Sequence, residues 1–189
     1  MLIYKIQRLI TRIGFFLRFL FWKLIYGKNL IFPLYYKSCI DPGAIIKNIG
    51  GVISFKGKFN CRRNLTINVL NGYLSIGNNV FFNQGVSINC QGKITIGDFS
   101  LFGEDVKIYD HNHRFSAPEL IMEQGFSIKD VNIGSNVWLG SNVVILSGVN
   151  IGDNAIISAG SIVREDVPEN MILKSGMLIK IIKENLSDE

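Results

Sequence analysis

Aliphatic residues recur at every sixth position through the second half of the chain. A second series at the same period, offset by four residues, holds small or β-branched residues. This period fits neither an α-helix nor simple hairpins and is typical of a parallel β-helix. The first series is Ile133, Leu139, Ile145, Ile151, Ile157 and Val163, and the second is Val137, Val143, Val149, Ala155, Ser161 and Val167.

The same period extends upstream with slips in its register. Each hexad is expected to form one short strand and a corner, so three hexads close one coil and the aliphatic residue points inward. Glycine or asparagine is favoured at the corners because both tolerate a positive φ. The sequence therefore predicts an all-β parallel β-helix of five to six coils over about residues 51–168. The upstream series are Ile53, Phe59 and Leu65, then Leu70, Ile76, Phe82, Ile88 and Ile94, then Ile96, Phe102 and Ile108.

The repeat is interrupted between Arg114 and Asp130, where the six-residue register is lost and then recovered. A long loop that leaves so regular a body is more often functional than accidental. It follows directly on a stretch, residues 110–113, that contains both histidines of the sequence, His111 and His113. Imidazole titrates near neutral pH and suits general-base chemistry. We expect His113, where a strand leaves for the loop, to lie at the rim of a cleft.

The first 40 residues form an arm of different character, and residues 41–189 form the main domain, with a tail at 169–189. The arm is basic and holds no acidic residue, and Lys5, Arg8 and Arg12 share one face of a predicted helix. Charges interrupt the apolar runs, which disfavours a membrane-spanning helix. The pattern favours an interfacial helix on a membrane. The alternative is a helix that packs on the rest of the protein or on a sister subunit. Its apolar residues at helical spacing are Leu9, Ile13, Phe16 and Leu20.

Composition limits the remaining classes. The net charge of +5 comes from the arm, so the body does not have the charge of a nucleic-acid-binding protein. Cys39, Cys61 and Cys90 are far apart, without metal-ligand spacing, which fits a reducing, cytoplasmic compartment and no metal site. Phosphate-binding-loop, dinucleotide-binding and serine-hydrolase motifs are lacking from the sequence.

Residues 133–163 resemble the signature run of hexapeptide-repeat acetyltransferases, and the resemblance covers about residues 50–185. The run is similar to that of the galactoside and maltose acetyltransferases and of the capsule and O-antigen O-acetyltransferases. The resemblance implies a left-handed β-helix and a homotrimer. It also implies acetyl-coenzyme A as co-substrate, held in a groove between neighbouring subunits.

The resemblance also implies roles for individual residues. The family's catalytic histidine falls on His113. We expect His111 to be structural or acceptor-facing, with the catalytic role as its alternative. The base also needs a partner on its other ring nitrogen, for which Asp110, Glu104 or a backbone carbonyl could serve. Residues 81–86 resemble the strand that lines the acceptor side, where Asn83 contacts the acceptor or the oxyanion, or is only a corner residue. Gly85 stands where the galactoside enzymes carry a second asparagine. The expected cofactor-binding residues are Trp138, Ser141, Ala159 and Gly160 beside the pantetheine arm, and Arg164, Lys174, Lys180 and Lys183 at the phosphates. Trp138 could equally fill a subunit interface.

The expected function is O-acetylation of a sugar hydroxyl, in a bacterial surface polysaccharide or its lipid-linked precursor. The arm would then hold the enzyme at the inner face of the cell membrane. N-acetylation of an amino sugar, acetylation of an antibiotic or serine, and a non-catalytic β-helix scaffold are the alternatives.

Overall fold

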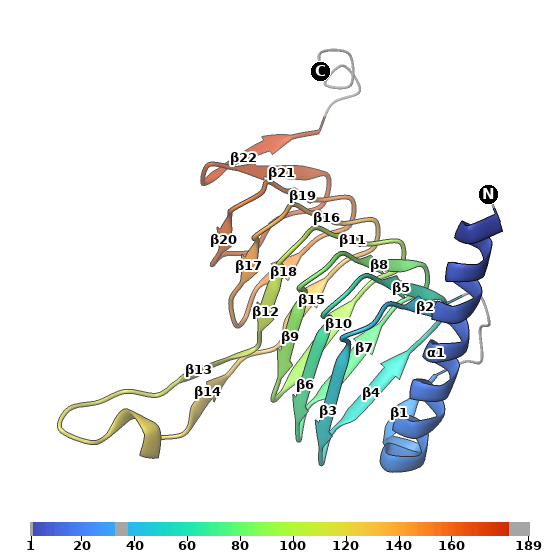
Figure 1. The fold of residues 1–189 in the computed structure, drawn as a ribbon. Coiled ribbons are helices and arrows are strands. Elements are labelled where there is room, and N and C mark those ends of the chain that lie inside the picture. The colour runs from blue at the N-terminus through green and yellow to red at the C-terminus, as the bar shows by residue number, and fades with distance from the viewer. Residues whose placement is uncertain (1, 33–37, 182–189) are drawn as a thin grey trace.

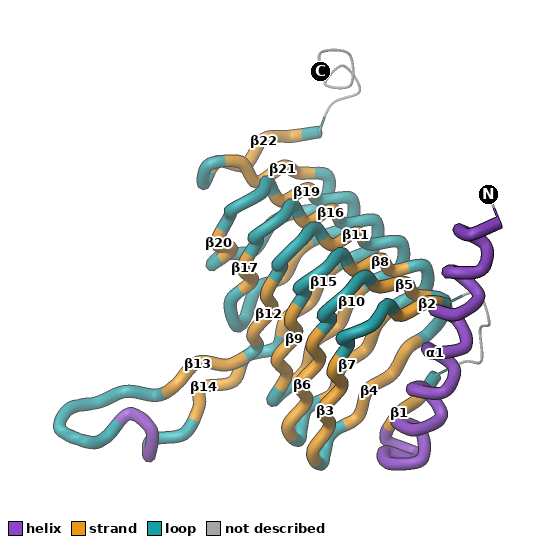
Figure 2. The backbone as a smooth tube through the Cα atoms, in the orientation of Figure 1, coloured by secondary structure: helices purple, strands orange, loops and turns teal. Residues whose placement is uncertain are grey.

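The computed structural model describes residues 2–32 and 38–181 of the chain. One helix, α1 (Leu2–Tyr26), is followed by a short 3-10 turn, η1 (Gly27–Asn29), and then by a parallel β-helix (Figure 1). Three sheets, here named A, B and C, form the sides of the β-helix, and successive strands of the chain visit them in turn. Figure 2 shows the strands stacked along the three sides with short turns between them. The predicted all-β parallel β-helix is confirmed.

Each sheet grows by one strand per coil, so six coils account for the body. Sheet A contains β1 (Leu30–Ile31), β4 (Val52–Phe55), β7 (Tyr73–Ile76), β10 (Lys93–Ile96), β15 (Val131–Ile133) and β18 (Asn150–Ile151). Sheet B contains β2 (Cys39–Ile40), β5 (Phe59–Cys61), β8 (Val80–Phe82), β11 (Leu101–Phe102), β16 (Trp138–Leu139), β19 (Ile156–Ile157), β21 (Met171–Lys174) and β22 (Met177–Lys180). Sheet C contains β3 (Ile45–Ile49), β6 (Thr66–Leu70), β9 (Ser87–Cys90), β12 (Lys107–Tyr109), β17 (Val144–Ile145) and β20 (Ile162–Val163).

The core is the stack of inward-pointing aliphatic residues that the six-residue period predicts. In sheet A, for example, Ile96 pairs with Ile133 and Ile133 with Ile151, and all three are buried. Every member of the series that starts at Ile133 is buried, which confirms it. Leu70 is an error of the upstream register: its side chain is 41% exposed. Residues alternate between the two faces of a strand, and in β6 the inward positions are Ile67 and Val69, so Leu70 points outward.

Asparagine dominates the corners that need a positive φ. Seven asparagines have φ between 54° and 62°. Their short polar side chains tolerate this conformation better than other residues with a Cβ. Several of them also stack along the β-helix: Asn136 donates to Asn154 at 2.9 Å and Asn154 to Asn170 at 3.0 Å. The seven are Asn64, Asn71, Asn79, Asn136, Asn142, Asn154 and Asn170.

The interruption of the repeat is an antiparallel hairpin that projects from the body between β12 and β15 (Figure 1). Its strands are β13 (His111–His113) and β14 (Phe126–Ile128), and its tip carries the 3-10 turn η2 (Ile121–Glu123). The predicted loop at 114–130 thus exists, but the extruded segment begins at His111 because His111 already pairs with Ile128.

Helix α1 packs one apolar side against the first coils. Phe15, Phe19 and Trp22 are buried, and Phe19 contacts Phe32, with ring centroids 4.7 Å apart. Phe32 in turn packs edge-on against Phe55 at 5.2 Å. No helix in the described part of the chain is long and apolar enough to cross a membrane.

Both ends of the β-helix differ from the predicted boundaries. The helix ends at Tyr26, and β1 and β2 already pair with β4 and β5, so the first coil begins before residue 40. The reason is that Leu30 and Ile40 are inward-pointing core residues. At the other end, β21 and β22 form a hairpin on sheet B, so the first part of the expected tail is ordered strand.

Candidate active site

A buried carboxylate holds one histidine at the base of the hairpin. Asp110 follows β12 and is fully buried. Its carboxylate accepts the backbone N–H of Gln91 at 2.9 Å and that of Gly92 at 2.8 Å, both from the corner of the preceding coil. Its Oδ1 lies 2.9 Å from Nδ1 of His111. The β-helix itself therefore fixes the position of the carboxylate that holds the ring.

This contact selects one tautomer of the neutral His111 ring. An ionised carboxylate only accepts hydrogen bonds, so Nδ1 carries the proton and donates it to Asp110. Nε2 then has a free lone pair and is the basic nitrogen. The ring also packs edge-on against Phe126, with centroids 5.2 Å apart. The His111 side chain is 16% exposed, so it is held on several sides and still open to solvent.

His113 is placed differently from His111. It lies two residues further along β13, is exposed, and stacks at a tilt on Phe126 with centroids 4.5 Å apart. Within the described residues its ring has no hydrogen bond. Of the partners expected for the His113 ring, Asp110 binds His111 instead, because its carboxylate turns back toward the β9–β10 corner. The Glu104 backbone N–H donates to Ser141 Oγ at 3.3 Å, on another corner.

A cavity of about 280 Å³ lies beside His111 on the outer face of sheet C. Its polar wall is a column of residues that pair across successive strands: Lys47 with Asn68, and Asn68 with Asn89. The Asn68 amide donates to Asn89 Oδ1 at 3.0 Å, and the Asn89 amide donates to Ser87 Oγ at 3.1 Å. This column was not predicted from the sequence. Aligning the chain coil by coil would have revealed it as a set of outward polar positions.

Asn83 is a corner residue in this structure. It follows β8, and its Oδ1 accepts the backbone N–H of Gln84 at 2.9 Å. Its own backbone N–H donates to the Phe102 carbonyl. Asn83 is not among the residues that line the cavity beside His111, so within one chain the two sites are not brought together.

The expected cofactor-binding residues divide into two groups. Ala159, Gly160, Arg164 and Lys174 line a second, larger cavity of about 800 Å³ at the C-terminal end of the β-helix. The other expected residues with described positions lie outside its lining: Trp138 on β16, Ser141 on the following corner, and Lys180 on β22. Lys183 lies outside the described residues. Among the described residues, no cluster of three or more histidine, cysteine or acidic side chains forms a metal site.

The fold is that of the hexapeptide-repeat class of transferases, and the comparisons agree. The family model "Bacterial transferase hexapeptide (six repeats)" matches residues 130–165. The Escherichia coli K12 protein WbbJ, named as an O-acetyl transferase of lipopolysaccharide biosynthesis, is 33% identical over 82% of this chain and 83% of its own length. The chain therefore belongs to the hexapeptide-repeat acetyltransferase family.

Two further proteins extend the comparison. Galactoside O-acetyltransferase of Escherichia coli K12 is 38% identical over 59% of this chain, and the match spans about half of that relative, 54% of its length. A hexapeptide-repeat-containing acetyltransferase from Vibrio cholerae, solved in complex with acetyl-coenzyme A, superposes with a TM-score of 0.51. It is 30% identical, over 72% of this chain and 62% of that one.

Proposed function

We propose that this protein transfers an acetyl group from acetyl-coenzyme A to a sugar hydroxyl, in a bacterial surface polysaccharide or its lipid-linked precursor. The observation that carries the proposal is the buried Asp110 paired with His111 beside a polar cavity. The names of the relatives support the reaction: one is an O-acetyltransferase of galactosides and one of lipopolysaccharide biosynthesis. The solved complex with acetyl-coenzyme A supports the acetyl donor.

In this proposal His111, and not His113, is the general base. Nε2 accepts the proton of the acceptor hydroxyl as the hydroxyl oxygen attacks the thioester carbonyl. The carbon–oxygen bond forms, the carbon–sulfur bond breaks, and the imidazolium returns its proton to the leaving thiolate. Asp110 is a positioning residue that fixes the ring and stabilises the imidazolium through Nδ1. Such a base contributes about 10²–10⁴-fold to the rate.

The polar column on sheet C is the proposed acceptor side. Sugar hydroxyls both donate and accept hydrogen bonds, and the amides of Asn68 and Asn89 offer both functions. The Lys47 ammonium adds a donor at the far end of the cavity. In this assignment Asn68 and Asn89 take the acceptor-side role that was expected of Asn83.

The acetyl donor is proposed to lie along the C-terminal coils. Ala159 and Gly160 offer a corner without bulky side chains, and a Cβ added at Gly160 would meet nothing within 4 Å. The cations Arg164 and Lys174 line the same cavity and suit phosphate groups as charge-assisted donors. Lys180 and Lys183 remain predictions from the resemblance.

We further propose a homotrimer. An apolar column runs along the outer face of sheet B: Phe81 pairs with Leu101, Leu101 with Trp138, and Trp138 with Ile156. Leu101 and Trp138 are exposed, Trp138 by 53%. A column of large apolar side chains on a regular sheet is the kind of surface that a neighbouring subunit covers. Of the two roles expected of Trp138, the proposal therefore favours the subunit interface.

The deciding experiment is thiol release from acetyl-coenzyme A against a panel of sugars and cell-surface polysaccharides. Wild type is compared with His111→Ala and His113→Ala. A fall of at least about a hundredfold in His111→Ala, with His113→Ala within about tenfold of wild type, supports the assignment. The reverse ranking restores His113 as the base. Turnover only with amino sugars would identify an N-acetyltransferase. Absence of both turnover and coenzyme A binding would identify a non-catalytic scaffold.

A further inference from the structure

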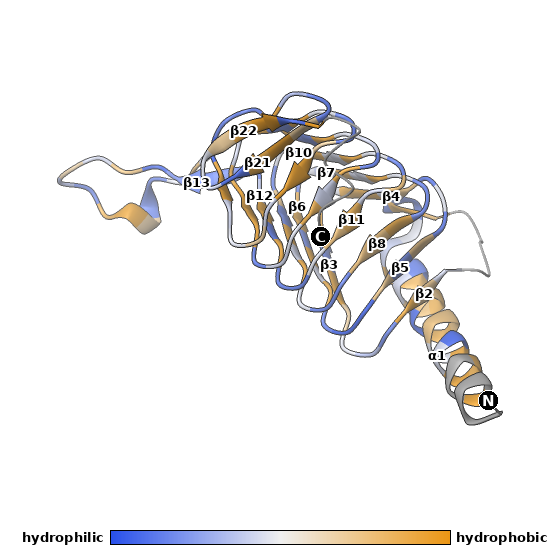
Figure 3. Ribbon diagram, turned by 90° about the horizontal axis from the view of Figure 1, so that it is seen from above, coloured by the Kyte–Doolittle hydropathy of each residue, from blue (hydrophilic) through white to orange (hydrophobic). Residues whose placement is uncertain are grey.

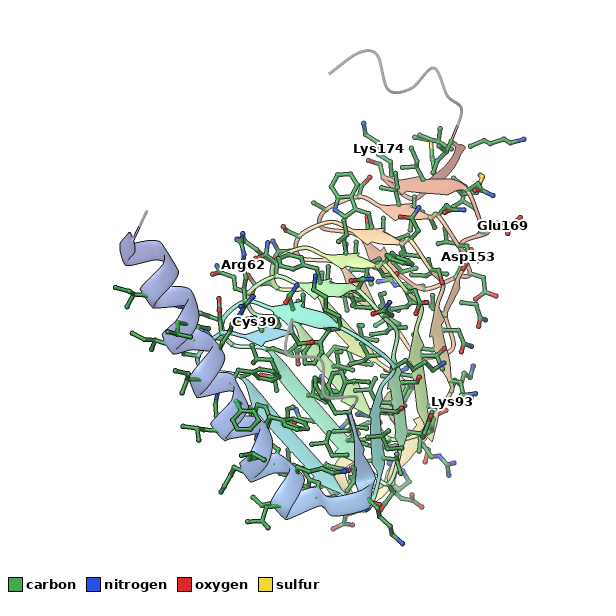
Figure 4. The ribbon with its side chains drawn as sticks, turned by 90° about the vertical axis from the view of Figure 1, so that its right-hand side faces the viewer. Cys39, Arg62, Lys93, Asp153, Glu169 and Lys174 are labelled. Carbon is green, nitrogen blue, oxygen red and sulfur yellow. The ribbon has the colours of Figure 1, made fainter. Side chains whose placement is uncertain are left out.

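Helix α1 carries a broad apolar face that nothing in the described chain covers. It is distinct from the buried side that holds Phe15, Phe19 and Trp22. At 100° per residue the uncovered residues span about half of the helix circumference, opposite that buried side. Figure 4 shows side chains on the outer side of α1 pointing away from the β-helix. The uncovered residues, 47–86% exposed, are Ile6, Leu9, Ile10, Ile13, Phe16, Leu17, Leu20, Phe21, Leu24 and Ile25.

The charged residues that accompany this face are all cationic. Residues 1–40 contain no aspartate or glutamate. Arg12 is exposed and lies one turn before Phe16, at the border of the apolar face, and Lys28 is exposed just after the helix. Two other cations are engaged in holding the helix: Arg18 donates to the Ile40 carbonyl at 2.8 Å, and Lys23 to the Leu30 carbonyl at 2.7 Å. The face is therefore apolar at its centre, with one cation at its border and another just beyond the end of the helix.

We propose that α1 docks in the plane of an anionic phospholipid bilayer, with its apolar face in the boundary between headgroups and acyl chains. A large apolar face with a cationic border is the pattern of interfacial helices, and basic residues are attracted to anionic headgroups. A second copy of this face is a poorer occupant, because it brings the same cations and no acidic partner for them. The inference does not depend on the proposed reaction.

Docking through α1 leaves the candidate active site open. In both Figure 1 and Figure 3, α1 and the β13–β14 hairpin project from opposite sides of the β-helix. His111 lies at the base of that hairpin. The helix therefore attaches the protein to the surface without covering the cavity beside His111.

The test is flotation of the full chain with vesicles of phosphatidylcholine alone and with about 30% phosphatidylglycerol. Wild type is expected to float with the anionic vesicles and to bind less as salt rises to about 0.5 M. The double variant Leu17→Gln/Leu24→Gln is expected to bind at least about tenfold more weakly, because it loses two of the inserted side chains. The matched control, Leu120→Gln/Met122→Gln, removes exposed apolar residues of the hairpin and is expected to bind like wild type.

Circular dichroism checks that each variant is folded, and sedimentation velocity measures its oligomeric state. The proposal is overturned if wild type does not bind anionic vesicles at low salt, or if the helix variant binds as tightly as wild type. It is also overturned if the helix variant alone dissociates into smaller species, since the face is then a contact between subunits. Thiol release measured on the same samples separates these outcomes from failure of the proposed reaction.

Discussion

Nδ1 of His111 lies 2.9 Å from Oδ1 of Asp110, and the same carboxylate accepts a backbone N–H from the preceding coil. The ring at the base of the hairpin is thus positioned by the β-helix and not by the hairpin alone. A hairpin that moves at its tip would leave this contact in place. The geometry therefore fixes the orientation of the His111 ring, as the proposed role of general base requires.

Replacing Asp110 by asparagine is expected to impair catalysis more than folding. The substituted side chain still has a carbonyl oxygen to accept the N–H of Gly92, but its amide would donate to Nδ1 and place the His111 proton on Nε2. That tautomer cannot act as a base, so we expect kcat to fall by about 10²–10⁴-fold with KM little changed. Steady-state thiol release measures both constants. Asp130→Asn changes an exposed carboxylate at the same base of the hairpin, also close to Gly92, and is the control that should keep its activity.

Removing an amide from the polar column is expected to weaken acceptor binding. Asn68→Ala and Asn89→Ala each remove one side of a 3.0 Å hydrogen bond and one candidate contact to the sugar. Losing one such contact costs about 1–1.5 kcal/mol, so KM for the acceptor should rise about fivefold to tenfold while KM for acetyl-coenzyme A stays unchanged. Asn132→Ala removes a similar asparagine contact on sheet A and is the control. Equal effects of all three variants would contradict the acceptor assignment.

Replacing Phe99 by asparagine at its corner is expected to stabilise the protein. Phe99 has φ of 59° and its side chain is 55% exposed, so it holds a left-handed conformation without much burial in return. The left-handed region costs a residue with a Cβ about 1–2 kcal/mol, less for asparagine. Phe99→Asn should therefore raise the free energy of unfolding by about 1 kcal/mol in urea unfolding.

The matched control for this corner is the opposite change. Asn136 has φ of 54° and donates to Asn154, so Asn136→Ala loses both the tolerated conformation and a hydrogen bond. It should lower the free energy of unfolding by about 1–2 kcal/mol. A Phe99→Asn protein less stable than wild type would show that the exposed ring is held by a contact between subunits.

The repeat could be predicted from sequence because a β-helix uses only local information. An inward residue and a corner recur within each hexad. The core series from Ile133 to Val163 can therefore be recognised without knowing which strands stack on each other. The error at Leu70 arose where strands lengthen to five residues and the period slips. Contacts between coils depend on those slips, so the pairing of Asn68 with Asn89 was not apparent.

The choice between the two histidines illustrates the same limit at the candidate site. His111 and His113 are two apart on one strand, so both reach Phe126 on the same face of the hairpin. What separates them is the carboxylate of Asp110, which turns toward Gln91 and Gly92, 19 and 18 residues earlier in the chain. That long-range contact cannot be predicted from the spacing of residues 110–113.

Two cysteines are expected to stay protonated and unreactive in the native protein and to make its stability depend on alkaline pH. Burial raises the pKa of the Cys61 thiol from about 9 to about 12. Burial, together with the nearby Asp110, raises the pKa of Cys90 well above its ordinary range. Because the thiolate is the reactive form, alkylation at pH 8 should label Cys61 and Cys90 only after unfolding, as peptide mass spectrometry would show.

The sign of the pH effect follows from the raised pKa. Below about pH 9 both states keep the Cys61 proton and the stabilisation is fully present. Above it the unfolded chain loses the proton and the native chain retains it, so the free energy of unfolding should fall by about 1.4 kcal/mol per pH unit for this thiol, up to the native pKa. Comparing the pH dependence of wild type with that of Cys61→Ala isolates the contribution, with Cys39→Ala as control. Parallel curves for wild type and Cys61→Ala would mean that the native thiol ionises as readily as the unfolded one.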